Sequence, residues 1–249
     1  MPRTHKTLKR LFVELDLTAG AVLVLDKDQS NYLLNVLRSR AGGQLVVFNG
    51  RDGAWLAEIG MQGKKTAALN LIEQTVAQTP PSDLWYGFAP LKSARLDYMI
   101  QKATEMGAGI IQPVMTRHTQ VSHIKRDRMR ANAIEATEQC EVLNVPDIPA
   151  ETSLTELLAT WTKVHGDRKL ILADEEAAAG TPVEALGALK GQRLGLLIGP
   201  EGGFAADERA LLRDQAFTIP ISLGPRILRA DTAAVAALAV IQAIIGDWR

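Results

Sequence analysis

Two consecutive prolines, Pro80 and Pro81, divide the chain into two stretches with different patterns. Proline has no backbone N–H and fixes its own φ, so a proline pair interrupts both helices and β-ladders and favours an extended connection. Before the pair, short strands and tight turns are expected. After it, strands alternate with helices. The sequence therefore predicts two domains, over residues 1–77 and 83–249, joined by a linker.

The first domain is predicted to be a small β-barrel. Two short apolar runs, Leu45–Phe48 and Ala54–Ile59, flank the dipeptides Asn49-Gly50 and Asp52-Gly53. Such dipeptides between β-rich runs are typical of hairpin turns. Further elements are expected at Leu69–Ile72, a strand, and at Asn31–Leu37, a short helix.

The second domain is predicted to be of the α/β class. Candidate strands are Leu84–Ala89, Gly109–Val114, Leu170–Ala173, Leu194–Ile198 and Ile219–Leu223. Candidate helices cover residues 96–106, 126–140, 154–161, 182–189 and 207–216, and a last helix begins with Asp231-Thr232 as its N-cap pair. Continuously apolar strands that alternate with helices indicate a parallel sheet covered on both faces.

Two of these strands lead into glycine-containing loops, at residues 199–204 and 223–233. Ligands of parallel sheets bind beyond the carboxyl ends of strands, and glycines let the backbone approach them closely. Neither loop has the Gly-Lys-Ser/Thr or G-x-G-x-x-G pattern of phosphate binders, and Glu201 repels phosphate. A neutral or cationic ligand fits better. For one loop alone, a tight turn without a ligand is the alternative.

Composition excludes several classes of protein. Hydrophobic residues make up 47% of the 249 residues, which is enough apolar surface to offset chain entropy and excludes bulk disorder, and 28 Lys and Arg balance 28 Asp and Glu. Cys140 is the only cysteine, which excludes an internal disulfide and a cysteine-based zinc site. His118 and His123 lack the spacing of metal ligands, so no metal is expected.

A cytoplasmic location is expected. No apolar stretch follows the basic residues near Met1, so no signal peptide is predicted. The longest apolar run, Ala233–Ile245, is shorter than the roughly 20 residues that span a bilayer, so no membrane partner is expected. Because the last helix is apolar on nearly all sides, a second subunit is expected to cover it in a homodimer.

Basic residues gather in two places and indicate a polyanionic partner for at least one of them, with a solvated face as the alternative. The first cluster is Arg3, His5, Lys6, Lys9 and Arg10; the second is Arg117, His118, His123, Lys125, Arg126, Arg128 and Arg130.

The two loops together, GPEGGF at 199–204 and LGPRILRADTA at 223–233, closely resemble the RsmE family, the small-subunit rRNA uridine-N3 methyltransferases of the SPOUT superfamily. Other similar segments are Lys92–Gly107, Glu138-Gln139-Cys140, Asn31–Leu37, Asn49-Gly50 and Gly53-Ala54-Trp55. The resemblance implies a PUA-like RNA-binding barrel followed by an α/β domain with a deep trefoil knot. It also implies a homodimer that methylates N3 of one uridine in the decoding region of 16S rRNA, in the small ribosomal subunit, with S-adenosyl-L-methionine (SAM) as methyl donor.

The chain departs from the family pattern at three positions. Val142 stands where the family usually has arginine, His118 follows Arg117 where serine is common, and Asp231 stands where glutamate is frequent. Asp231 keeps the charge, whereas Val142 removes one RNA or dimer contact and leaves the cofactor site unaffected.

The resemblance also assigns site residues. The expected SAM contacts are Ile198, Gly199, Pro200, Gly202, Gly203, Leu223, Gly224, Ile227 and Leu228. Asp174 and Glu175 follow a strand and bind the ribose, lie near the sulfonium or cap a helix; the sequence does not decide among these. The RNA contacts are expected at Arg10, Arg38, Lys92, Arg95 and Arg226, for each of which surface solubility is the alternative.

The reaction requires that uracil N3 lose its proton, so a base or a cation that stabilises the anion is needed. Arg229 is the first candidate for that cation and Arg226 the second. Glu201 is a candidate base, or else a structural acceptor of backbone N–H groups. Two other functions stay open: 2′-O-methylation of an RNA ribose, and a non-catalytic role in ribosome assembly.

Overall fold

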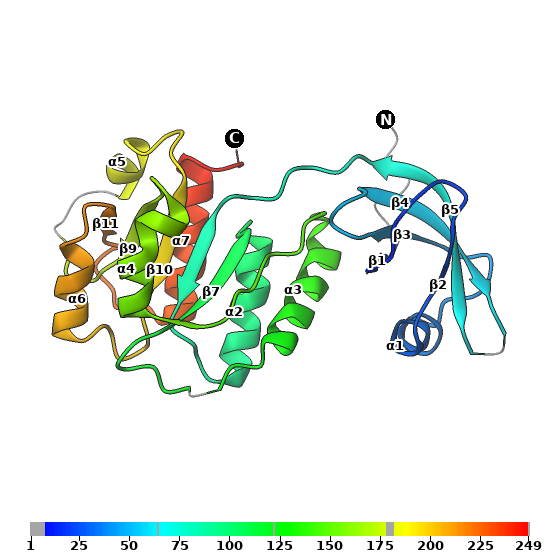
Figure 1. Ribbon diagram of the computed structural model, residues 1–249, viewed down its shortest axis with the longest axis horizontal. Coiled ribbons are helices and arrows are strands. Elements are labelled where there is room, and N and C mark those ends of the chain that lie inside the picture. The colour runs from blue at the N-terminus through cyan, green and yellow to red at the C-terminus, as the bar shows by residue number, and fades with distance from the viewer. Residues whose placement is uncertain (1–7, 64, 122, 178–181, 249) are drawn as a thin grey trace. The chain divides into compact units, whose positions relative to one another are not determined.

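The computed structural model describes residues 8–63, 65–121, 123–177 and 182–248 (Figure 1). The chain divides into two compact units. The first contains the residues up to Pro80 together with Thr137–Val145, and the second contains Pro81–Ala136 and the residues from Pro146 onward. Arg3, His5 and Lys6 of the first basic cluster lie outside the described residues.

The first unit is a curled five-stranded sheet with the order β1-β3-β4-β5-β2 (Figure 1). Strand β1 runs parallel to β3, and the other neighbours are antiparallel. The strands are β1 (Arg10–Phe12), β2 (Val22–Val24), β3 (Gln44–Phe48), β4 (Ala54–Met61) and β5 (Ala67–Val76). The run expected as a strand at residues 69–72 is thus the middle of a ten-residue strand.

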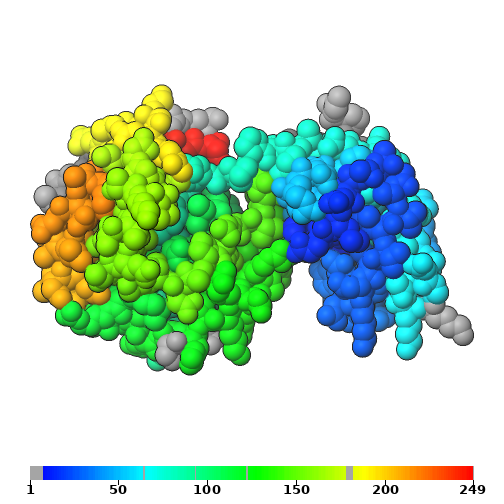
Figure 2. Space-filling view, in the orientation of Figure 1, coloured from blue at the N-terminus to red at the C-terminus, as the bar shows by residue number. Residues whose placement is uncertain are grey.

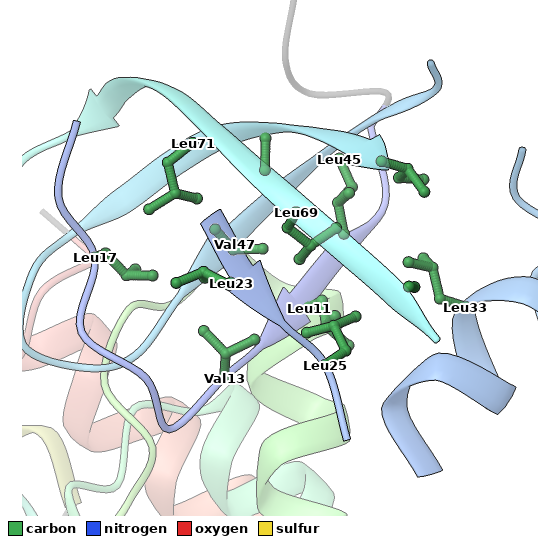
Figure 3. Packing of buried hydrophobic residues seen from close by; sticks show 13 residues of the cluster. Leu11, Val13, Leu17, Leu23, Leu25, Leu33, Leu45, Val47, Leu69 and Leu71 are labelled. Atoms are coloured by element: carbon green, nitrogen blue, oxygen red, sulfur yellow. The ribbon is translucent and has the colours of Figure 1, made fainter. Parts of the chain in front are cut away.

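Alternate residues of these strands build one apolar core. Leu45 and Val47 of β3, Leu69 of β5 and Leu23 of β2 are all buried and point into the space that the sheet encloses (Figure 3). Leu33 closes this core from a helical segment. Because side chains alternate between the two faces of a strand, one face of the curled sheet is sealed.

The helical segment of this unit begins earlier than the sequence predicts. The prediction started it at Asn31, whereas α1 (Lys27–Asn31) precedes a π-helical turn, η1 (Tyr32–Val36). The Asp26 side chain accepts a hydrogen bond of 2.7 Å from Gln29 N and caps the helix. A capping aspartate stabilises a helix start among polar residues, which apolar periodicity does not reveal.

The second unit contains a six-stranded parallel sheet with the order β11-β9-β10-β6-β7-β8 (Figure 1). Its strands are β6 (Trp85–Phe88), β7 (Ile110–Met115), β8 (Thr152–Ser153), β9 (Lys169–Ala173), β10 (Leu194–Ile198) and β11 (Thr218–Ile221). Five of them correspond to predicted strands, and the two-residue β8 was not predicted.

Helices cover both faces of this sheet. They are α2 (Ser93–Glu105), α3 (Arg126–Cys140), α4 (Leu154–His165), α5 (Pro182–Gly187), α6 (Ala206–Arg213) and α7 (Ala230–Ile244). On one face, α4 and α6 pack on Leu170 and Leu172 of β9, in a cluster that includes Trp85 and Trp161. The two helices form neighbouring parts of the surface (Figure 2). Helix α7 contacts α2, α5 and β10.

The predicted start of the last helix is wrong by two residues. Arg229, with an extended backbone, occupies the N-cap position, and α7 begins at Ala230. The Asp231 carboxylate accepts a hydrogen bond of 2.8 Å from Thr232 N, within the first turn. Among the described residues, no helix is long and apolar enough to cross a membrane.

Candidate cofactor site

A cavity of about 640 Å³ opens where β9, β10 and β11 end, entirely within the second unit. It is lined by Arg95, Ala173, Asp174, Glu175, Ile198, Gly199, Pro200, Glu201, Gly202, Gly203, Phe204, Arg209, Leu223, Gly224, Arg226, Ile227, Leu228, Arg229, Ala230 and Ala233. All nine residues predicted to contact SAM are in this set. So are both candidate catalytic residues and two of the five predicted RNA contacts.

The loop after β10 has a shape that requires glycine at two positions. Gly203 has φ +70° and donates a hydrogen bond of 2.8 Å to Pro200 O, which closes a tight turn. A Cβ at Gly199 would lie 2.7 Å from the Phe204 ring. Phe204 packs against the core cluster under α4, so the ring has little room to move. The peptide backbone of residues 199–203 is therefore exposed directly to the cavity.

The loop after β11 supplies the opposite side. Gly224 has φ +103°, a conformation that other residues rarely adopt. Leu223 and Leu228 are half-buried, whereas Ile227 is 88% exposed. Arg226 and Arg229 are exposed, and no carboxylate of the described residues pairs with either. The loop therefore offers both apolar surface and two guanidinium groups at the cavity.

Glu201 has a partner that the sequence does not reveal. Its Oε1 accepts a hydrogen bond from Nη1 of Arg95 on α2, and both side chains are 40% exposed. The two residues were predicted to have separate roles, in catalysis and RNA binding. The ion pair joins the start of α2 to the first glycine loop.

A network of charges lies at the end of β9. Asp174 is buried and accepts hydrogen bonds of 2.8 and 2.6 Å from Arg213 and of 3.1 Å from Glu176 N. Glu175 is exposed, and its Oε1 lies 3.6 Å from Nη2 of Arg209. Arg209 also pairs with Glu176, whose carboxylate raises the pKa of Arg209. Both Asp174 and Glu175 line the cavity, but Asp174 is buried and held by hydrogen bonds, whereas Glu175 is exposed and has only the longer contact with Arg209.

The other three predicted RNA contacts are not among the residues that line the cavity. Arg10 is half-buried; its Cζ lies 4.4 Å from the Phe48 ring centroid and its Nη2 donates to Val142 O at 2.9 Å. Burial lowers the pKa of Arg10. Arg38 is exposed with φ +53°, and Lys92 is exposed at the N-cap position of α2.

The cavity fits SAM by volume and by chemistry. Pockets for small molecules usually enclose about 300–1,000 Å³. Ile198, Leu223 and Leu228 provide apolar walls for a purine, and the carboxylates of Glu175 and Glu201 suit a ligand with a positive centre. Within the described ranges, no group of three or more His, Cys, Asp or Glu side chains is arranged to hold a metal ion.

Comparison with known protein families defines the class. Residues 78–242 match a family described as an RNA methyltransferase domain, and residues 25–72 match an RNA methyltransferase PUA domain. The ribosomal RNA small subunit methyltransferase E of Rickettsia conorii is 32% identical over 234 residues, which are 94% of either chain. The chain belongs to the ribosomal RNA small subunit methyltransferase E family.

Two solved structures share this fold over nearly the whole chain. A putative methyltransferase from Legionella pneumophila, in complex with bound SAM, is 30% identical with a TM-score of 0.81, and the match covers 95% of this chain and 97% of that one. A ribosomal RNA small subunit methyltransferase E from Neisseria gonorrhoeae, bound to S-adenosyl methionine, is 27% identical with a TM-score of 0.80, at 97% and 100% coverage. The predicted family and the predicted architecture, an α/β RNA methyltransferase domain after a PUA-like domain, are confirmed.

Proposed function

We propose that this chain transfers the methyl group of SAM to N3 of one uridine in 16S rRNA, in the decoding region of the small ribosomal subunit. The observation that carries this proposal is the cavity between the two glycine loops, because it gathers all the expected SAM contacts and has Glu201 and Arg229 on its wall. In this proposal residues 83–249 form the catalytic domain and residues 1–77 the RNA-binding domain.

The cofactor is held by both loops. When bound, SAM supplies an electrophilic methyl group on a positively charged sulfur. Ile198, Leu223 and Leu228 line the cavity and would pack against the adenine, and the backbone of residues 199–203 would hydrogen-bond its polar edge. Glu175 is the acidic group at the end of β9 that stays available to the ligand, since Asp174 is engaged by Arg213.

The chemical task of the protein is to deprotonate uracil N3 and stabilise the anion. Arg229 stabilises the negative charge that develops on the uracil ring, and Arg226 holds the RNA beside it. Glu201 accepts the proton, and Arg95 orients the Glu201 carboxylate through their ion pair. The uridine must leave its stacked position in the RNA to reach this wall.

RNA phosphates are neutralised by basic residues of both units. Arg38 and Lys92 are exposed and suited to phosphate contact, and Arg95 and Arg226 lie at the cavity. Arg10 contacts Phe48 and Val142 within the first unit, and these contacts occupy only part of its guanidinium group. Such contacts orient an RNA without reading its sequence.

A homodimer in the cytoplasm completes the proposal. Helix α7 buries Ala234, Ala237, Leu238 and Ile241, while Val235 and Val240 of the same helix are only half-buried. A second copy that packs on these residues removes more apolar surface from water. The ribosomal substrate requires the compartment where small subunits are made.

The proposal is tested with small ribosomal subunits that lack native methylation. The purified protein is incubated with labelled SAM and subunits, and the labelled nucleoside is identified by mass spectrometry. N3-methyluridine in 16S rRNA is expected. A 2′-O-methyl nucleoside would instead indicate ribose methylation, and absence of both transfer and SAM binding would leave a non-catalytic assembly protein.

The Arg229→Ala variant tests the role of the cation. Loss of a group that stabilises transition-state charge typically lowers kcat by about 10²–10³-fold. We expect a decrease of this size with the SAM dissociation constant nearly unchanged, measured by single-turnover methylation and by calorimetry. Lys163→Ala, at an exposed lysine in the last turn of α4, is the control. Equal losses of SAM affinity and of turnover would instead indicate that Arg229 binds the cofactor.

A further inference from the structure

The turn that follows β7 is held in one shape by its own hydrogen bonds. Thr116 N donates to Thr119 Oγ1 at 2.9 Å, and the two hydroxyl oxygens also lie 2.9 Å apart. Thr119 N donates back to Thr116 O at 3.1 Å. The two residues between these threonines, Arg117 and His118, are exposed and are therefore presented in a defined direction.

Arg117 connects this turn to the start of α6. Its Nη1 and Nη2 donate to the Asp207 carboxylate at 2.8 and 2.5 Å, and its backbone N donates to Glu208 Oε1 at 2.8 Å. The other oxygen of Glu208 accepts from Ala205 N at 3.0 Å. The guanidinium lowers the pKa of Asp207. The turn is thus attached to the residues that directly follow the first glycine loop.

His118 contacts the glycine loop itself. Its Nδ1 lies 3.0 Å from Gly203 O, and since a carbonyl only accepts, Nδ1 carries the hydrogen. The His118 side chain also packs on Gly202: a Cβ at Gly202 would lie 3.6–3.9 Å from His118 Cβ, Cγ and Nδ1. Gly202 and Gly203 line the cavity, whereas His118 does not. The histidine therefore contacts the loop without lining the cavity.

The Gly202–Gly203 peptide needs such support. Gly203 lies in the left-handed region at φ +70°, and the hydrogen bond of its N to Pro200 O secures the peptide from within the loop. Two successive glycines lose more conformational freedom on ordering than any other pair of residues. The hydrogen bond from His118 reduces the freedom that SAM would otherwise have to remove on binding.

We propose that His118 is a positioning residue of the cofactor site: its imidazole holds the Gly203 carbonyl, and through it the Gly202–Gly203 backbone, in the conformation that accepts SAM. Arg117 supports the same turn through Asp207 and Glu208. This inference rests on the proposed function only in taking SAM as the ligand. It assigns a role to a position where this chain departs from the family pattern.

The experiment compares SAM binding by calorimetry in His118→Ala, His118→Asn and the wild type. The alanine variant loses one hydrogen bond, so its dissociation constant is expected to rise about fivefold. Asparagine places an N–H donor the same number of bonds from Cα as Nδ1, so it is expected to restore most of the affinity. His123→Ala, at an exposed histidine outside the cavity, is the control and is expected to bind like the wild type.

Two further readouts separate positioning from folding and from catalysis. The melting temperature of the ligand-free protein is expected to stay unchanged in His118→Ala, because the residue is exposed. In methylation assays KM for SAM is expected to rise with kcat unchanged. SAM affinity equal to wild type in His118→Ala would overturn this inference and leave the proposed function intact, whereas a wild type that binds no SAM would overturn both.

Discussion

Replacement of Gly199 by alanine tests whether the first glycine loop forms the cofactor site. The added Cβ would lie 2.7, 3.1 and 3.1 Å from three atoms of the Phe204 ring. Ordinary contact needs about 3.5–4.0 Å between carbons, so ring and loop must separate by roughly 1 Å. Phe204 packs on the cluster of Trp161 and Leu212, which resists movement of the ring.

The added methyl group causes strain of a predictable size, which either the loop or the Phe204 ring can relieve by moving. Inserting a methyl group into a packed site costs about 1–3 kcal/mol. If the loop moves, the ligand-free protein keeps its stability and the SAM dissociation constant rises about 5–150-fold, because about 1.4 kcal/mol corresponds to tenfold. If the ring moves instead, the melting temperature falls and SAM binding changes less. We expect the first outcome, because Glu201 and Gly202 of the loop are exposed, whereas Phe204 packs on the cluster under α4.

Calorimetric titration with SAM and a thermal melt of the ligand-free protein distinguish these outcomes. Gly187→Ala is the matched control, because a Cβ there meets no atom within 4 Å and the φ angle is not in the left-handed region. Phe204→Leu combined with Gly199→Ala is expected to restore part of the affinity. A Gly199→Ala protein with wild-type affinity and wild-type melting temperature would refute the reasoning.

Two further predictions concern the opposite end of the sheet. Arg168 is 1% exposed and donates to Leu194 O at 2.8 Å and to Asp83, so Arg168→Met removes the hydrogen bonds of a buried charged donor and is expected to cost about 1–3 kcal/mol in denaturant unfolding. Arg193→Met removes an exposed partner of the same Asp83 and should cost clearly less than Arg168→Met; equal costs for the two variants would contradict the argument. Burial, with repulsion from Arg168 and Arg193, lowers the pKa of His165 to about 4. Because the unfolded chain binds this proton near pH 6.5, stability should fall as the pH drops from 6.5 towards 4, and less steeply in His165→Leu; identical slopes in urea melts at pH 7, 6 and 5 would exclude this role.

Local signals were enough to predict most of the second unit. The apolar runs of β9 and β10 (Leu170–Ala173 and Leu194–Ile198) were found within a residue, because strands buried on both faces are apolar throughout. The helix at residues 126–140 was found at both ends. The start of α7 was misplaced because Asp231 was chosen as the N-cap from its side-chain type, whereas the helix already begins at Ala230. The two-residue β8 carries no pattern of its own.

The contacts that organise the site lay beyond sequence reasoning. Arg95 and Glu201 are 106 positions apart and His118 and Gly203 are 85 apart, so no local period connects them. The grouping of nine predicted SAM contacts around one cavity was foreseeable, since both loops follow strands of one parallel sheet. The ion pairs could not be predicted because they depend on how the strands are ordered in space. A resemblance to a family does not give that order for individual residues.

The strand order has a consequence for synthesis on the ribosome. Strand β6 lies between β7 and β10, and Trp85 stands opposite Gly195, which is translated about 110 residues later, on the order of ten seconds at typical rates. During that interval the β6 edge of a nascent β6–β7 pair is open, and it carries Trp85, Tyr86 and Phe88, all fully buried in the finished protein. Open apolar edges attract other chains. The yield of active enzyme will therefore depend on how quickly residues 116–193 are translated and on the chaperones that cover β6 in the meantime.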